Sequence, residues 1–390
     1  MKEREGRYRI PLSSVLTLGV WGFMFGIKSG LSLDQFLREH KEGIEGGLGQ
    51  KVFSDSTFAR RLSGMDIESL REAWYGVLRR LRRKKVLGSS LRLLLDGSGA
   101  EGSYKGKCEL CHEKKGQKRK NHYFVLGWLC DEELGFPIDA EPILPGENEG
   151  KAAERIWQRF RKHFPRTHLT LVLDAFYKGP FIQRAKEAGI DVVVKVKGDM
   201  EILRDAQGLL PLVPCIKGFD RERNERYEIR DVKELRSWGS VHFPLRLLEI
   251  VEYRQKPKRE EDRYEKFYVV TTLSSWECSA EEIRRMMHQR WHIENKGFRT
   301  LKQDWGLGHA IHHNPTAIVA VWMLMCIGLF FVLLFTHRHL WRLRKRWRQK
   351  KMSYKKIREN IRDAFICWLG EVSRKLESTK GTTASPRPPT

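Results

Sequence analysis

The order of apolar segments between residues 91 and 196 constrains the fold of this chain more than any other feature of its sequence. Five short apolar runs, bounded by polar residues, predict buried strands. They cover residues 91–96 (LRLLLD), 122–131, 135–144, 169–174 (LTLVLD) and 190–196. Apolar residues at helical spacing predict helices at 147–164 and 178–189. The predicted order is three strands, a helix, a strand, a second helix and a fifth strand.

Two of the predicted strands end on an acid, Asp96 and Asp174. A ribonuclease H-like mixed sheet has this order of elements, and its neighbouring strands bring the two carboxylates to one edge. Gly97 leaves space for a phosphate beside the first acid. Either acid alone is as consistent with an ordinary turn, but the pair favours a site. We therefore expect an α/β fold, a ribonuclease H-like mixed sheet with helices on both faces.

The remaining segments surround this core. The expected parts are a helical region that could dock on DNA (1–88), the core itself (89–197 and 276–335), a β-rich insertion (198–275), a basic helical region (336–377) and a disordered tail (378–390). A solvated basic helix surface would explain the N-terminal pattern as well as a DNA contact does.

Lysine and arginine outnumber the acidic residues by 73 to 49, which gives a formal net charge of +24. Nucleic acid would neutralise this excess with release of counterions, so we expect nucleic acid as the partner. A basic protein that only resists aggregation, or lies on anionic lipid, would show the same charge. The seven cysteines are an odd number, and the N-terminus MKEREGRYRI does not have a signal-peptide pattern. We therefore expect a cytoplasmic, nucleoid-associated protein.

Residues 316–335 are continuously apolar for about the thickness of a bilayer, and a basic segment follows them. A membrane span and a buried central helix both fit this pattern. The soluble, DNA-directed character of the preceding sequence favours the buried helix, so no membrane is expected.

A third acid, Glu294, lies on a predicted helix that begins at Ser279, with Glu282 completing a capping box. Arg290 precedes Glu294 by four residues, so both share a helix face and the arginine could hold a DNA phosphate. An ordinary surface ion pair has the same spacing. Phosphodiester chemistry with two Mg²⁺ ions requires acids from separate elements. Asp96, Asp174 and Glu294 are the candidate metal-binding and catalytic residues.

The segments LDG, LVLDAFY, KFYVVTTL and RWHIENKGFRTLKQ resemble the DDE transposases of insertion sequences, in the group with a β-strand insertion before the final glutamate. The similarity covers roughly residues 85–315. It implies DNA strand cleavage and transfer at the ends of a mobile element, with Mg²⁺ or Mn²⁺ bound by the three acids. It also implies double-stranded DNA partners, namely terminal inverted repeats and target DNA, and a homodimer on paired ends. The candidate DNA-binding residues are Arg290, Lys302, Arg299 and His288.

Two positions depart from the family pattern. Met287 stands where a tyrosine is usual, so its phosphate contact is absent or comes from His288 or another group. Lys302 lies eight residues after Glu294, which puts it about 80° off that face of a regular helix. A one-residue π-bulge near Gly297 would restore the alignment.

The segment CELCHEKKGQKRKNH contains a Cys-x-x-Cys-His motif. Haem attachment would need export, so zinc is the better candidate ligand. Cys108 and Cys111, with either His112 or His122 and with Cys130 as a further donor, could bind Zn²⁺. Two reduced cysteines in a basic loop are the alternative.

Two other functions fit the same core. A ribonuclease H-like nuclease would cleave DNA without strand transfer, and an inactive derivative would only bind DNA. Three acids at the expected positions argue against the inactive derivative.

Overall fold

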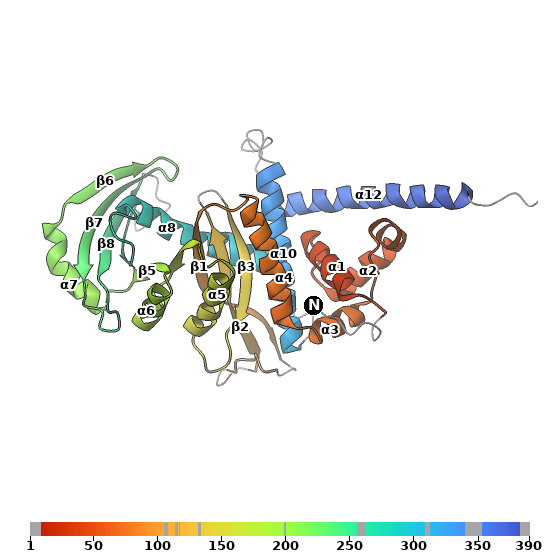
Figure 1. Ribbon diagram of the computed structural model, residues 1–390, viewed down its shortest axis with the longest axis horizontal. Helices are drawn as coiled ribbons and strands as arrows, with labels where there is room; N and C mark the ends of the chain where they lie inside the picture. Colours follow the sequence, from red (N-terminus) through yellow and green to blue (C-terminus); the bar gives the residue numbers. More distant parts are fainter. Residues whose placement is uncertain are drawn as a thin grey trace, which may run out of the picture.

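A nine-stranded sheet forms the backbone of the protein (Figure 1). The computed structural model describes residues 9–104, 108–113, 116, 118–131, 134–198, 200–255, 263–308, 313–339 and 353–382. The strands are β1 Ser90–Ser103, β2 Lys120–Cys130, β3 Gly135–Pro142, β4 His168–Leu173, β5 Asp191–Val196, β6 Cys215–Asp220, β7 Glu225–Leu235, β8 Leu245–Arg254 and β9 Tyr264–Thr271. Their order across the sheet is β3-β2-β1-β4-β5-β9-β8-β7-β6.

Helices precede, interrupt and follow these strands. They are α1 Leu12–Met24, α2 Gly30–Glu39, π-helix η1 Gly43–Gly47, α3 Asp55–Ser63, α4 Ile67–Arg83, α5 Glu149–His163, α6 Gly179–Glu187, α7 Glu201–Leu209, 3-10 helix η2 Leu210–Leu212, α8 Ala280–His292, π-helix η4 Ile293–Phe298, α9 Arg299–Gln303, α10 Pro315–His339 and α12 Tyr354–Thr382.

The first five strands confirm the predicted ribonuclease H-like order. β1 pairs in parallel with β4, and β4 in parallel with β5, while β2 and β3 are antiparallel. One boundary was wrong, because β1 does not end at Asp96. The parallel ladder with β4 stops at the pair Leu94–Val172, whereas the antiparallel ladder with β2 continues to Ser103. Asp96 therefore lies at the point where β1 loses one neighbour and keeps the other.

The β-rich insertion continues the core sheet. β9 pairs antiparallel with β5, and β8, β7 and β6 extend the sheet beyond it. In Figure 1 these strands curve away from the core, with α7 packed beside them. The insertion therefore leaves the core after β5 and returns to it through β9, which pairs with β5.

Helices cover both faces of the core sheet. A β-carbon at Gly127 of β2 would meet Ile156 of α5, whereas one at Gly297 of η4 would meet Leu126. Successive residues of a strand point to opposite faces. Consequently α5 and η4 lie on opposite faces, as the sequence predicts for this fold.

The long apolar segment forms the helix α10. By length and hydropathy it could cross a membrane, but 83% of its most apolar window is buried inside the protein. Its rings pack on other elements, including Trp322 against Phe124 of β2 and Phe330 against Trp74 of α4. These contacts describe a buried core helix.

The C-terminal helix α12 projects beside the N-terminal helices (Figure 1). It continues to Thr382, so the start of the tail at 378 is helical rather than disordered, and residues 383–390 lie outside the described part. Trp21 and Phe25 of the N-terminal region pack on Phe365 of α12. Between α10 and α12, most of the predicted basic segment also lies outside the described residues.

Candidate active site

Asp96 and Asp174 lie at the same level of two neighbouring strands. Leu94 pairs with Val172, and each acid follows two residues later in the chain. Residues two apart in a strand share a face, so Asp96 points to the same side of the sheet as Leu94, and Asp174 directly follows β4 at the edge where this ladder stops. Asp96 pairs with Leu126, the residue that Gly297 of η4 approaches. Asp96 therefore faces the helix that carries the third acid, and Asp174 lies close enough for its charge to raise the pKa of Asp96.

That helix consists of α8, η4 and α9 in succession. Ser279 and Glu282 form the predicted capping box at its start. The π-helix η4 includes Gly297, where the spacing of Lys302 predicted a bulge. A side chain at this glycine would press on Leu126 and Trp128 of β2. The glycine thus allows the helix to approach the sheet closely.

Arg290 lies between two of the acids. Its Nη1 atom is 2.8 Å from Oε1 of Glu294 and 3.8 Å from Oδ2 of Asp96. The arginine side chain is 8% exposed, whereas the Glu294 side chain is 46% exposed. A buried cation is thus positioned between the half-buried carboxylate of Asp96 and the accessible carboxylate of Glu294, and joins the third acid to the first.

A fourth acid, Glu149, joins the site from the start of α5. A β-carbon on Gly97 would overlap its carboxylate, so the space that the sequence assigned to a phosphate is taken by this side chain. The hydroxyl of buried Tyr177 donates a 2.8 Å hydrogen bond to Oε1 of Glu149. Asn148 caps the helix. Sequence reasoning missed Glu149 because an acid after an asparagine cap is an ordinary helix start.

The clustered acids perturb one another. The pKa of Asp96 is raised from 3.8 to about 7, chiefly by burial and then by the charge of Glu149, while Arg290 opposes the shift. Glu294 and Asp174 also raise the pKa of Asp96. Burial raises the pKa of Glu149, while its hydrogen bond from Tyr177 acts in the opposite direction. The site therefore holds more negative charge than Arg290 offsets.

This excess of carboxylate oxygen fits a divalent cation such as Mg²⁺ or Mn²⁺, which prefers such ligands. The carboxylate oxygens of the three predicted acids do not all lie within 4.8 Å of one another. Within the described part of the chain, the sets of three or more ligand atoms that lie within 4.8 Å of one another are found elsewhere. Two of the three acids, Asp96 and Glu294, instead flank the Arg290 guanidinium.

Lys302 reaches the same region. Its Nζ atom donates a 2.7 Å hydrogen bond to Oγ of Ser98, two residues after Asp96. The π-helix thus brings the lysine back toward the acids despite its late position in the sequence.

The other two predicted DNA-binding residues are placed differently. His288 Nε2 lies 2.5 Å from Oε1 of Glu252 on β8, so its ring is directed to the insertion. Arg299 is exposed and bonds to Gln303 one turn later.

His288 also belongs to a compact cluster with Glu225 and Glu252, whose ligand atoms lie within 4.8 Å of one another. Arg284 pairs with both acids of this cluster. The negative charge that a cation would require there is therefore already neutralised.

The predicted zinc ligands separate into two groups. Cys108, Cys111 and His122 lie together, and His313, which the sequence analysis did not select, joins them. His112 is turned away, with Nε2 at 2.7 Å from the carbonyl oxygen of Ile143. Cys130 lies outside the cluster and is buried near Trp128.

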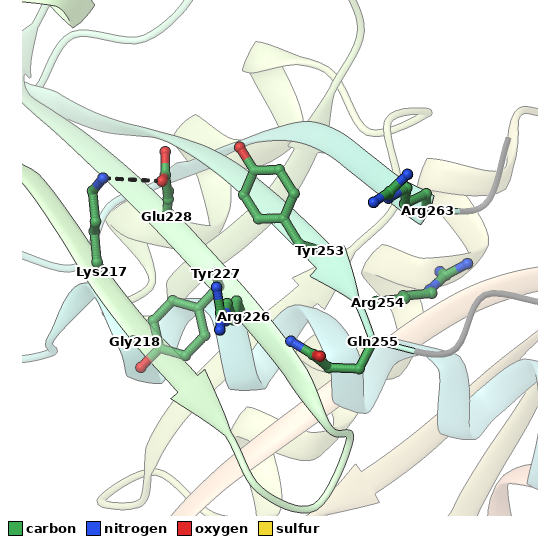
Figure 2. Close-up of a pocket in the computed structure, with 9 residues that line it drawn as sticks. All are labelled: Lys217, Gly218, Arg226, Tyr227, Glu228, Tyr253, Arg254, Gln255 and Arg263. Atoms are coloured by element: carbon green, nitrogen blue, oxygen red, sulfur yellow. Dashed lines mark ion pairs between the residues drawn. The ribbon is translucent and has the colours of Figure 1, made fainter. Parts of the chain in front are cut away.

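A cavity of about 770 Å³ lies on the insertion, away from the acids (Figure 2). The residues that line it are Lys217, Gly218, Arg226, Tyr227, Glu228, Tyr253, Arg254, Gln255 and Arg263. Lys217 pairs with Glu228, the one acid among them, at 3.2 Å. Its basic and aromatic lining suits a phosphate backbone, but it contains none of the clustered acids that phosphodiester chemistry requires.

The family model described as the transposase DDE domain matches residues 89–331. This range contains the five core strands, the insertion and the helix with Glu294. No curated protein matches the chain.

Proposed function

The chain belongs to the transposase DDE domain family, and from this premise we propose that it cuts DNA at the ends of a mobile element and joins those ends to target DNA. Family membership carries the general activity, cleavage and transfer of DNA strands. The arrangement of Asp96, Asp174 and Glu294 supports the finer proposal. The observation on which it depends is the shared register of the two aspartates, with Arg290 linking Asp96 to Glu294.

The three acids would hold Mg²⁺ or Mn²⁺, which activates the attacking oxygen and stabilises charge on the leaving oxygen. Arg290 keeps Asp96 and Glu294 close together despite their like charges, and its remaining donors can hold a phosphate oxygen. Lys302 lies beside Ser98 and can bind the DNA backbone next to the acids.

The proposed reaction has two steps at this site. A water oxygen attacks the phosphorus at the element's end, and the 3′-oxygen leaves with a proton as a 3′-OH. This hydroxyl then attacks a phosphorus of the target strand, whose own 3′-oxygen leaves in turn. The phosphorus bonds are exchanged directly, so the protein forms no covalent intermediate.

The partners that we propose are the terminal inverted repeats and the target DNA, with a homodimer on paired ends in the nucleoid. The cavity on the insertion adds several cations that can contact phosphates, including Arg226 and Arg254. The helical region 1–88 and the basic region 336–377 are further candidates for DNA contacts.

The test uses the full chain with a labelled duplex from the DNA that flanks its gene, a supercoiled target plasmid and Mg²⁺. We expect nicks with 3′-OH ends and joined products. Asp174→Asn should abolish both, whereas Asp205→Asn, at an exposed position on α7, should keep both. Nicks without joining would indicate a nuclease. DNA binding without nicks would indicate an inactive derivative, and either result overturns the proposal.

A further inference from the structure

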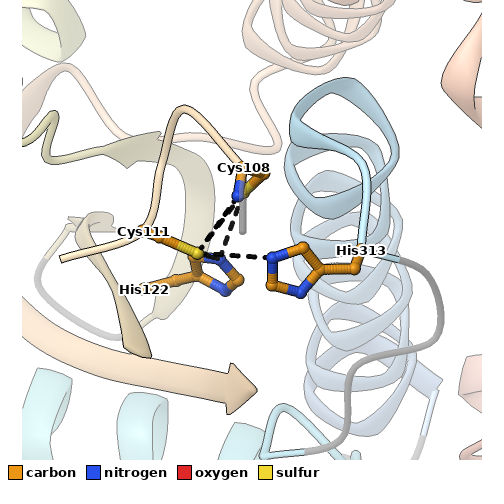
Figure 3. Close-up of side chains that lie close together, drawn as sticks. All are labelled: Cys108, Cys111, His122 and His313. Atoms are coloured by element: carbon orange, nitrogen blue, oxygen red, sulfur yellow. Dashed lines mark hydrogen bonds between the residues drawn. The ribbon is translucent and has the colours of Figure 1, made fainter. Parts of the chain in front are cut away.

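Four side chains from three segments converge beside the start of α10. Cys108 and Cys111 lie between β1 and β2, and His122 lies on β2. His313 precedes Asn314, whose side chain accepts a hydrogen bond from the Ala317 amide in the first turn of α10. One ligand atom of each of the four lies within 4.8 Å of the others. Figure 3 shows the two thiols and the two imidazoles turned toward one another.

The distances between these atoms are those of a tetrahedral metal site. The two sulfurs are 3.8 Å apart. Nε2 of His122 lies 3.4 Å from each sulfur, and Nε2 of His313 lies 3.3 Å from the Cys111 sulfur. Zinc bonds of about 2.3 Å to sulfur and about 2.0 Å to nitrogen require about 3.8 Å between sulfurs and about 3.5 Å between sulfur and nitrogen.

From this agreement we infer that Cys108, Cys111, His122 and His313 bind one Zn²⁺ ion. Thiolate and imidazole are ligands that Zn²⁺ prefers, whereas Mg²⁺ and Mn²⁺ prefer oxygen. A disulfide would need the sulfurs at about 2.05 Å, far closer than they lie. The site is therefore chemically distinct from the four acids.

The ion has a structural role, because four protein ligands fill its tetrahedral shell and leave no position for a substrate. It joins the connection after β1, the strand of Asp96, to the segment just before α10, which begins at Pro315. His122 is fully buried and Cys111 is 6% exposed, so the ligands are held by the packed core. The zinc links a segment that follows Asp96 along the chain to one that follows Glu294, and this role is independent of the proposed DNA chemistry.

The first experiment measures the metal content of the full chain, purified without chelators and dialysed extensively. We expect about one zinc per chain in the wild type. His313→Ala should weaken zinc binding by more than about 10-fold in competition with a chromogenic chelator. His313→Cys should restore it, because cysteine is also a zinc ligand. His112→Ala is the matched control, since His112 adjoins Cys111 but contacts the Ile143 carbonyl, and it should bind zinc as the wild type does.

A second measurement uses Co²⁺ in place of zinc and does not depend on the folding of any variant. Wild-type protein with Co²⁺ should show a thiolate-to-cobalt charge-transfer band and the strong visible bands of tetrahedral cobalt. Carboxylates alone would give no such charge-transfer band, so the acidic site cannot imitate this result. The inference is overturned if the wild type holds no thiolate-bound metal, or holds a metal other than zinc. It is equally overturned if His112→Ala and His313→Ala affect zinc binding alike.

Discussion

Gly97 and Glu149 are packed so closely that a β-carbon on the glycine would overlap the glutamate carboxylate. Gly97 is on β1, directly after Asp96, and Glu149 begins α5 on one face of the sheet. The missing side chain therefore admits a fourth acid into the site. Because Gly97 admits Glu149, the charge of Glu149 lies close enough to raise the pKa of Asp96.

Gly97→Ala should displace Glu149 and lower the DNA-cleaving activity. Overpacking of this kind costs about 1–3 kcal/mol, so the unfolding temperature should also fall. Gly99→Ala is the control, because a β-carbon there meets its neighbours at ordinary distances, the Tyr123 ring at 3.5 Å and the His122 carbonyl oxygen at 4.0 Å. Cleavage assays and thermal unfolding of both variants test this. Equal behaviour of the two variants would show that the Glu149 contact is unimportant.

Glu149→Gln should remove the negative charge of this side chain while keeping its size and shape. The glutamine can still accept the hydrogen bond from Tyr177, but it removes the carboxylate that adds to the raised pKa of Asp96. We expect the Mg²⁺ concentration for half-maximal cleavage to rise by about 10-fold, with a smaller effect at saturating Mg²⁺. Glu154→Gln on the same helix, where Glu154 pairs with Arg184, should leave this concentration unchanged. An unaltered Mg²⁺ requirement in Glu149→Gln would remove Glu149 from the site.

Asp96→Asn should abolish cleavage and yet stabilise the metal-free protein above neutral pH. The pKa of Asp96 is raised from 3.8 to about 7, so the folded state binds this proton more tightly than the unfolded chain does. Stability from this group is therefore fully present below pH 4 and is lost as the pH rises to 7. The loss is about 2–4 kcal/mol, and asparagine avoids it.

Thermal unfolding at pH 5 and pH 8 measures this effect, in magnesium-free buffer without a chelator so that any zinc is kept. The unfolding temperature of the wild type should fall more between these pH values than that of Asp96→Asn. At pH 8, addition of Mg²⁺ should raise the unfolding temperature of the wild type but not that of Asp96→Asn. A variant that is less stable than the wild type at pH 8 without Mg²⁺ would contradict the prediction.

Local sequence patterns predicted the fold well, because strand and helix periodicity are local properties. The five core strands, the capping box at Ser279 and the buried α10 all follow from such patterns. The π-helix at Gly297 followed from a geometric requirement, the late position of Lys302. The end of β1 was misplaced because β2, a partner some 25 residues later in the chain, sustains the strand beyond Asp96.

The residues that were missed are those that tertiary packing brings to a site. Glu149 resembles any acid in the first turn of a helix, and only the empty space over Gly97 admits it among the other acids. His313 lies about 190 residues after His122, in a segment of the sequence whose histidines carry no spacing signal for metal. Choosing between His112 and His122 required tertiary structure, because His122 on β2 has its ring in the core whereas His112, before β2, has its ring against the Ile143 carbonyl.

Arg358→Ala should release the C-terminal helix from the rest of the protein. Arg358 is 3% exposed and donates hydrogen bonds to the carbonyl oxygens of Phe23 at 2.6 Å and Asp304 at 2.9 Å. Its guanidinium also stacks on the Trp305 ring, 4.2 Å from the centroid. One side chain thus ties α12 to the end of α1 and to the end of the helix that carries Glu294.

The loss of these charged hydrogen bonds should lower the free energy of unfolding by about 2–3 kcal/mol. This is less than the summed contributions of the individual bonds, because burial of the guanidinium itself destabilises the folded state. That cost is visible in the pKa of Arg358, which burial lowers to about 10. Arg358→Lys should recover only part of the stability, since an ammonium cannot stack and bridge in the same way. Arg362→Ala removes an arginine that, within the described part of the chain, pairs only with its neighbour Asp363, so it should change stability by less than about 0.5 kcal/mol. Chemical unfolding and limited proteolysis report the result. If Arg358→Ala unfolds like Arg362→Ala and keeps α12 equally protected, the helix is anchored by its aromatic contacts instead.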